Sequence, residues 1–93
     1  MPLNQKVTFK TILQKQNRLQ VPKLIRWRYK LDSSEILKVT VKIGGGLLNV
    51  RESFFARIYE NGRIRIPNLA IALLKGDKPS IEGYAIEVTL EPT

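Results

Sequence analysis

The sequence contains no cysteine and no histidine. Their absence excludes a disulfide scaffold, a thiol nucleophile, a Cys/His zinc site and any catalytic step that needs an imidazole. No apolar run is long enough for a membrane-spanning helix, and the first ten residues lack the apolar stretch of a secretory signal. Acidic residues are also few, eight against sixteen Lys plus Arg, which gives a net charge of +8. We therefore expect a basic, cytoplasmic protein.

Enzymatic motifs are missing as well. The glycine run at 44–46 lacks the Lys and Ser/Thr that a phosphate-binding loop needs, and the acidic residues are spaced as surface or strand charges. We predict that the protein is not an enzyme and holds neither a cofactor nor a metal. Its 93 residues, 43% of them hydrophobic, suffice for one packed domain and are too apolar for a disordered basic tail.

Positive charge is concentrated in the first half of the chain. Residues 1–45 contain ten of the basic residues and two of the acidic ones, whereas residues 46–93 contain six of each. A one-sided positive field indicates a polyanionic partner, most often nucleic acid. The alternative interpretation is that the charge serves solubility alone.

The chain contains an internal repeat with an offset of 45 residues. The segment 17–22 reads NRLQVP and the segment 62–67 reads GRIRIP, so both follow the pattern Asn or Gly, Arg, apolar, polar, apolar, Pro. We predict one domain over residues 1–93, built of a basic repeat (7–43), a Gly-rich flexible linker (44–52) and a neutral repeat (53–91).

Each repeat is predicted to run strand, tight turn, short strand, short helix, strand. Alternating apolar residues favour strands at 7–13, 18–21, 36–43, 54–59, 63–66 and 84–90. Asn and Gly in the turns tolerate a positive φ, and Pro22 and Pro67 suit the first turn of a helix. Helices of about two turns are expected at 23–30 and 68–75, the second closed by Gly76. The fold class is therefore mainly β with two short helices.

This order of elements around the Arg-apolar-x-apolar-Pro motif resembles the SpoVT/AbrB-like family, which includes AbrB, MazE and MraZ. The resemblance covers about residues 7–43 and 54–91. It implies a swapped-hairpin β-barrel in which two copies interlock around a pseudo-twofold axis. Because both copies lie in one chain here, the barrel is expected as an intrachain pseudo-dimer, either monomeric or paired into a homodimer.

The resemblance also implies a DNA-binding site. In members that bind DNA, the arginine of the motif and basic residues early in the helix contact the duplex. The matching residues are Arg18 and Arg63 in the motif and Arg26 in the first helix, with Lys23 and Arg28 nearby. Independently of the family, guanidinium groups bind phosphate bidentately, and Lys10, Lys15, Lys38 and Lys42 would add unspecific attraction.

Other interpretations of these residues remain open. Arg18 and Arg63 could instead stabilise the turns or pair with Glu60 or Asp77, and Lys38 and Lys42 could form a solvated strand face. Trp27 and Tyr29, interleaved with arginines, are candidates for stacking on bases, or could pack on the flank of the barrel. Phe54 and Phe55 are expected in the core and as a lid, and an exposed one would mark a protein interface.

Two functions follow from these expectations. The first is a DNA-binding protein, either a small transcription regulator or a nucleoid-associated protein. The alternative is a non-catalytic accessory subunit of a larger replication or repair complex, with the basic half on double-stranded DNA and the neutral half docking a protein. In both, the halves contribute unequally, because Ile71 and Leu73 stand where the first helix has Arg26 and Arg28.

Overall fold

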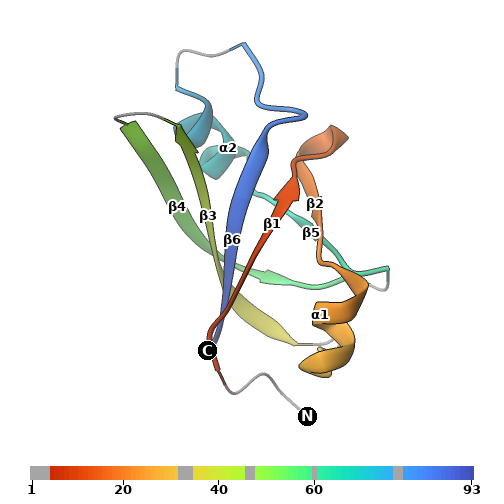
Figure 1. Ribbon diagram of the computed structural model, residues 1–93. Helices are drawn as coiled ribbons and strands as arrows, with labels where there is room; N and C mark the ends of the chain where they lie inside the picture. The colour runs from red at the N-terminus through yellow and green to blue at the C-terminus, as the bar shows by residue number, and fades with distance from the viewer. Residues whose placement is uncertain (1–4, 32–34, 46–47, 60, 77–78) are drawn as a thin grey trace.

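The computed structural model describes residues 5–31, 35–45, 48–59, 61–76 and 79–93 (Figure 1). It is a mainly β protein with two short helices, as predicted. In chain order the elements are β1 (Val7–Ile12), a 3₁₀ turn η1 (Lys15–Asn17), β2 (Arg18–Gln20), α1 (Lys23–Arg28), β3 (Ile36–Gly45), β4 (Leu48–Arg57), β5 (Arg63–Arg65), α2 (Asn68–Lys75) and β6 (Ala85–Pro92).

The strands form two antiparallel sheets. One has four strands in the order β1-β6-β3-β4, and the other is a two-stranded ribbon of β2 and β5. In Figure 1 the ribbon crosses behind the four-stranded sheet, with α1 and α2 at opposite ends. All four ladders, β1·β6, β3·β6, β3·β4 and β2·β5, join a strand of residues 1–45 to a strand of residues 46–93. The two repeats are therefore interlocked strand by strand.

The two repeats are related by a pseudo-twofold axis through the ribbon. The Val21 amide donates to the Gly62 carbonyl at 2.8 Å, and the Ile66 amide donates to the Asn17 carbonyl at the same distance. Val21 and Ile66 are 45 residues apart, and so are Asn17 and Gly62. Each hydrogen bond is therefore the counterpart of the other under the repeat offset. The offset grows to 49 in the last strand of each repeat, where Leu37 on β3 matches Ile86 on β6, because both α2 and the connection after it are longer than their counterparts in the first repeat.

The prediction of a flexible linker over residues 44–52 is wrong. β3 continues to Gly45, β4 begins at Leu48, and these two residues are paired in an antiparallel register. The repeats are thus joined by a β-hairpin, and the second repeat begins inside the segment interpreted as a linker. The physical reason is that glycine next to a hairpin tip can still take part in a ladder through its backbone, so a glycine run alone does not indicate an unpaired segment.

The strands do not close into one hydrogen-bonded barrel. The four-stranded sheet ends at β1 and β4, and in the described part of the chain no ladder joins either edge to the ribbon. Backbone bonds at the two turns make the connection instead: the Gln14 amide donates to the Arg18 carbonyl, and the Tyr59 amide donates to the Arg63 carbonyl. Short strands at the ribbon leave too few backbone groups for further ladders.

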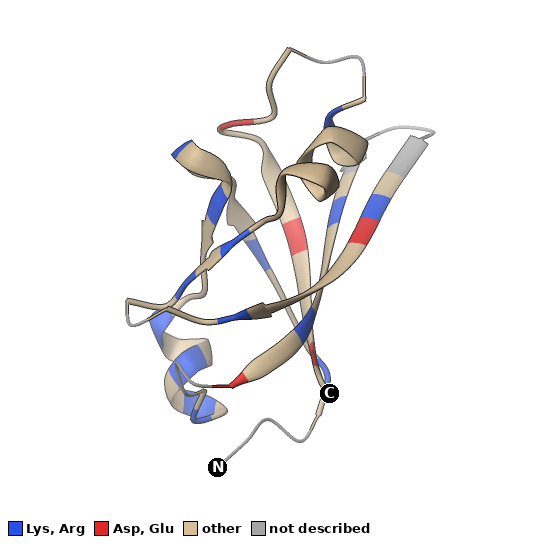
Figure 2. Cartoon of the chain, turned by 180° about the vertical axis from the view of Figure 1, so that it is seen from behind, with Lys and Arg blue, Asp and Glu red and all other residues tan. Residues whose placement is uncertain are grey.

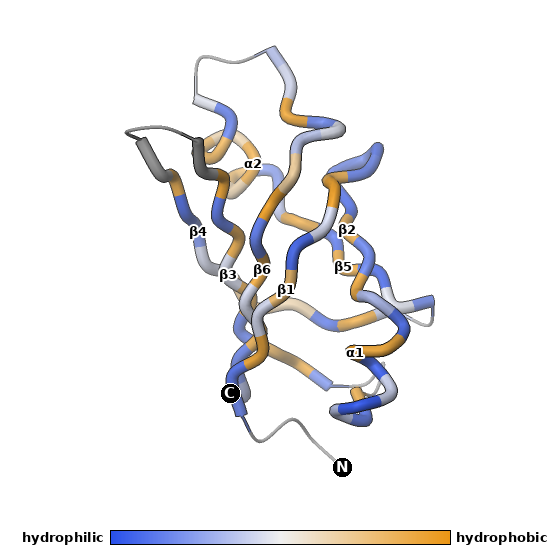
Figure 3. The backbone as a smooth tube through the Cα atoms, in the orientation of Figure 1, coloured by the Kyte–Doolittle hydropathy of each residue, from blue (hydrophilic) through white to orange (hydrophobic). Residues whose placement is uncertain are grey.

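The core lies between the ribbon, the helices and the inner face of the four-stranded sheet. Eighteen apolar side chains are buried, nine from each half, and no polar side chain is buried among the described residues. Figure 3 shows the alternation of apolar and polar positions along the strands. The predicted inward pairs, Leu19 with Val21 and Ile64 with Ile66, are all essentially inaccessible. Because successive side chains of a strand point to opposite faces, the residues between these inward-facing positions lie on the outer face of the ribbon.

Both helices begin directly after the predicted prolines. Pro22 precedes α1 and Pro67 precedes α2, each at an extended φ/ψ that ends the ribbon strand. Because the missing N–H of proline costs nothing at a helix start, these residues separate strand from helix without loss of a ladder bond. α2 ends at Gly76, whose φ is 56°, as predicted for a C-terminal glycine. The helices thus continue from the two ends of the ribbon.

Candidate nucleic-acid interface

The outer face of the ribbon carries three arginines and one glutamine. Because Leu19 and Ile64 point into the core, their neighbours Arg18 and Gln20 on β2, and Arg63 and Arg65 on β5, lie on the opposite side. We call these four residues the ribbon face. No Asp or Glu occurs anywhere in η1, β2, β5, α1 or α2. The ribbon face therefore brings together positive charge from both repeats.

The strand register places two of these arginines directly opposite each other. Arg18 is the cross-strand partner of Arg65, and Gln20 is the partner of Arg63. The second pair has internal partners, since Arg63 Nε donates to Gln20 Oε1 at 3.4 Å and Gln20 Nε2 donates to the Asn61 carbonyl at 2.6 Å. In the first pair, Arg18 Nε is buried and donates to no described residue.

Opposed like charges destabilise a sheet unless an anion lies between them. A cavity of about 170 Å³ opens at this point and is lined by Gln16, Arg18, Tyr59, Asn61, Arg63 and Arg65. Among the described residues that line it, all the charged ones are arginines. The geometry is suited to a phosphate group, because planar guanidinium groups bind such oxygens through paired N–H donors.

Helix α1 adds exposed cations beside the ribbon. Lys23 and Arg28 are both exposed, at the start and the end of the helix. Lys23 Nζ lies 4.9 Å from the centre of the Trp27 ring, and the Arg28 guanidinium carbon lies 5.8 Å from the centre of the Tyr29 ring. Trp27 is 66% exposed, so it does not cap the core, whereas Tyr29 packs against it. Of the two aromatic candidates, only Trp27 has a ring that is mostly open to solvent.

Arg26 is placed differently from its neighbours on the helix. It is half-buried, its Nε makes no hydrogen bond to a described residue, and its side chain lies against Gly62 in the turn before β5. Gly62 has a φ of +80°, and a Cβ atom there would collide with the Arg26 side chain. Arg26 therefore packs α1 onto the turn of the other repeat, while its outer atoms extend the positive surface of the ribbon.

Replacing Gly62 by alanine is expected to be more destabilising than the same change at Gly83. Both glycines have φ near +80°, which costs an alanine about 1–2 kcal/mol, but a Cβ at Gly83 meets no atom within 4 Å. Urea denaturation of Gly62→Ala, Gly83→Ala and the double variant Gly62→Ala/Arg26→Ala measures the difference. We expect the double variant to recover part of the excess cost. Equal costs for the two single variants would contradict the described packing of Arg26.

Several predicted residues lie away from the ribbon face. Lys10 is exposed on the outer face of the four-stranded sheet, opposite Glu87 in register, and Lys38 and Lys42 lie on the same sheet face. This agrees with their alternative interpretation as a solvated strand face. Lys15 is exposed in η1, at the entrance to β2. Glu60 and Asp77, the alternative partners of Arg18 and Arg63, lie outside the described residues.

The ribbon face contains basic residues from both halves of the chain. β2 contributes Arg18 and β5 contributes Arg63 and Arg65 to the same face, so positive charge on the ribbon is not confined to the first half. The described acidic residues lie instead on β4 and β6 or in the segments before β3 and β6. Figure 2 shows the blue positions of the ribbon and α1 gathered on one side of the molecule.

Four residues at the ribbon face and its cavity were not among the predicted site residues: Arg65, Gln20, Tyr59 and Asn61. The signal for Arg65 was present, because Arg63 and Arg65 flank a single apolar residue in a predicted strand and must share a face. Gln20 follows from the same rule on β2. Tyr59 and Asn61 lie in the turn before β5, and their position at the cavity depends on how the turns fold over the ribbon.

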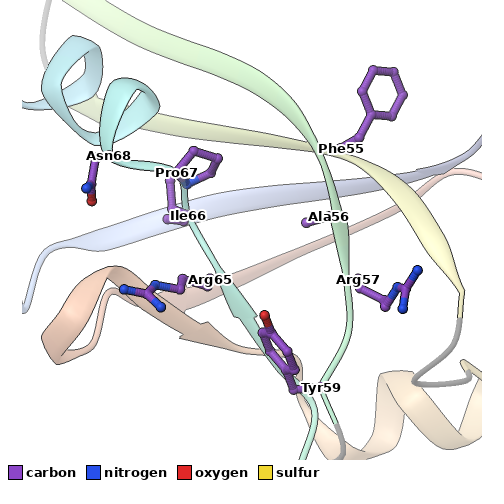
Figure 4. Close-up of a pocket in the computed structure, with 8 residues that line it drawn as sticks. All are labelled: Phe55, Ala56, Arg57, Tyr59, Arg65, Ile66, Pro67 and Asn68. Carbon is purple, nitrogen blue, oxygen red and sulfur yellow. The ribbon is translucent and has the colours of Figure 1, made fainter.

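A second cavity of about 340 Å³ lies between the diverging strands β4 and β5 (Figure 4). Tyr59 and Arg65 line both this cavity and the one on the ribbon face. Of the two phenylalanines expected in the core and as a lid, Phe54 packs against the core, while Phe55 is 67% exposed at the rim of this cavity.

Within the described ranges there is no cluster of acidic side chains that could hold a metal ion. None of the helices in these ranges has the length and apolar character needed to cross a membrane.

One solved structure supports the fold, whereas sequence comparison gives no match. No family model and no curated protein sequence matches the chain. The solution structure of PHS018 from Pyrococcus horikoshii is similar, with a TM-score of 0.80 and 22% sequence identity over 91% of this chain and 88% of that one. At this identity the similarity shows a shared fold: two short helices on antiparallel sheets.

Proposed function

We propose that this chain is a non-catalytic protein that binds double-stranded DNA through its ribbon face. The observation that carries the proposal is the direct opposition of Arg18 and Arg65, with a buried Arg18 Nε that has no described partner. A folded protein gains nothing from this pair in the absence of an anion, because opposed like charges repel. A phosphate between the two guanidinium groups would convert the repulsion into two charge-assisted contacts.

The shape of the ribbon also fits a duplex. The major groove of B-DNA admits a two-stranded β-ribbon, and arginine and glutamine are the side chains that read guanine and adenine edges there. Here the open face of the ribbon presents Arg18, Gln20, Arg63 and Arg65. The exposed Lys23 and Arg28 of α1 would contact the phosphates of the DNA backbone. In this proposal the phosphate contacts give the affinity and the ribbon side chains any sequence preference.

The architecture behind this proposal is the interlocked two-copy unit of the SpoVT/AbrB-like family, completed within one chain. The cross-repeat ladders and the paired Val21 and Ile66 bonds support it. Since each strand of one repeat has its partner in the other, the proposed working form is a monomer. A nucleoid-associated protein and a transcription regulator both fit this form, and selectivity for an operator sequence separates them.

The second candidate function is an accessory subunit of a DNA-handling complex. It is favoured by exposed apolar side chains on α2, where Leu69 is 73% and Leu73 51% exposed. A helix that presents two leucines to solvent is a common feature of protein-docking surfaces. In that case DNA binding shows no sequence preference, and the partner protein co-purifies after nuclease treatment.

Binding to a labelled duplex is expected to weaken steeply with salt. If four to five phosphates are contacted by the ribbon and α1, the slope of log K against log salt is about −4. Fluorescence anisotropy at several salt concentrations measures it, and an uncharged polymer of similar size serves as the control. A chain that fails to bind any duplex at low salt would remove the proposed function.

A further inference from the structure

The cavity between β4 and β5 has the chemistry of a nucleotide site. Arg65 on β5 and Arg57 on β4 lie on its two sides with their side chains extending away from each other, and Tyr59 lies between the strands where they meet (Figure 4). The Tyr59 side chain is 56% exposed, so its ring is accessible. Within the part of the chain that the structure describes, no acidic residue lines the cavity. An open aromatic ring flanked by guanidinium groups is the combination that holds single-stranded nucleic acid, with the base on the ring and the phosphate on the cations.

The internal repeat shows that the fold does not require these side chains. The positions of Tyr59, Arg65 and Arg57 in the first repeat are occupied by Gln14, Gln20 and Ile12. The same backbone hydrogen bond occurs in both places, since the Gln14 amide donates to the Arg18 carbonyl as the Tyr59 amide donates to the Arg63 carbonyl. The first repeat keeps this hydrogen bond without an aromatic ring or cations at these positions. The ring and the two cations of the second repeat are therefore not needed to form the fold.

The cavity is continuous with the ribbon face. Tyr59 and Arg65 line both cavities, and Arg18 lines the one on the ribbon face with them. A nucleic-acid strand whose phosphate lies at Arg18 and Arg65 can place its next base on Tyr59 only if that base is unpaired, because a paired base is stacked inside the duplex.

We propose that this cavity binds one unpaired nucleotide adjoining a duplex, with the base stacked on Tyr59 and its phosphate held by Arg65. The proposal rests on the proposed function, because the duplex is held by the ribbon face. An acidic peptide would meet the same arginines, but it would leave the Tyr59 ring without a stacking partner. The ligand class is therefore a duplex end or junction with a single-stranded extension.

The test compares one duplex in two forms, blunt and with a short single-stranded overhang, against the full-length chain. We expect the overhang to raise affinity about tenfold, the gain typical of one stacked base. The variant Tyr59→Gln, which copies Gln14 of the first repeat, should abolish this gain, so that the blunt and overhang duplexes bind it with equal affinity. Tyr59→Phe should keep the gain, because stacking needs the ring and not the hydroxyl.

Two further measurements, a control variant and a peptide competition, make the outcome decisive. Tyr84→Ala changes another exposed tyrosine away from the cavity and should leave the gain intact. If blunt and overhang duplexes bind equally well, the nucleotide site is absent while the proposed function stands. If neither binds, both fail. If a poly-glutamate peptide displaces the overhang duplex from the wild-type chain but not from Tyr59→Gln, the cavity is a peptide site and the proposal is overturned.

Discussion

Residues 1–45 and 46–93, produced as separate fragments, are expected to be unfolded as monomers. Every ladder in the structure pairs a strand of one fragment with a strand of the other, so an isolated fragment has no partner for any of its strands. It would also expose its nine core side chains, and about forty-five residues bury too little surface to fold alone. Circular dichroism and analytical ultracentrifugation of each fragment measure folding and association state.

Mixing the two fragments is the control for this prediction. The chain is cut at the tip of the β3–β4 hairpin, where a break leaves the ladders intact. An equimolar mixture is therefore expected to fold, with a thermal midpoint that rises with concentration. Fragments that fold only by pairing with themselves would agree with the pseudo-twofold relation of the repeats. A stable folded monomer of either fragment would contradict interlocking.

The elements were predictable because their signals are local. Alternation at Leu19, Val21, Ile64 and Ile66 indicated the ribbon strands, and Pro22 and Pro67 placed the helix starts. The hairpin in place of a linker was not predictable in the same way. Whether the glycines at 44 and 45 pair depends on the strand that returns beside them, which is a long-range property. The change of offset from 45 to 49 likewise follows from the longer α2 and the longer connection after it.

The site was only partly predictable, for a related reason. The motif identified Arg18 and Arg63 as a pair, but the functional juxtaposition is Arg18 with Arg65, and it depends on the register between strands 45 residues apart. Charge counted along the chain suggested one active half, whereas pairing of β2 with β5 mixes the halves on one face. The exposure of Trp27 and the placement of Arg26 on Gly62 depend on tertiary packing, which composition does not report.

Replacing Arg18 and Arg65 together by glutamine is expected to weaken binding to duplex DNA about tenfold to a hundredfold and to flatten the salt slope by about two units. The reason is that each guanidinium group neutralises one phosphate of the duplex. The thermal midpoint should stay the same or rise, because the change replaces two opposed cations by two neutral side chains and removes the repulsion between like charges. Anisotropy titrations and thermal melts of the same preparations measure both effects.

The central claim is that nucleic acid binds to the ribbon face and not to the positive field of the whole chain. Its most direct test compares the double variant Arg18→Gln/Arg65→Gln with the double variant Lys10→Gln/Lys42→Gln. The second variant removes the same charge from the outer face of the four-stranded sheet, where both lysines stand opposite Glu87 in register. In one titration at physiological salt, where exposed charges more than about 8 Å apart are largely screened from each other, we predict at least a tenfold loss for the ribbon variant and less than about threefold for the sheet variant. Equal losses, or a larger loss for the sheet variant, would contradict the claim.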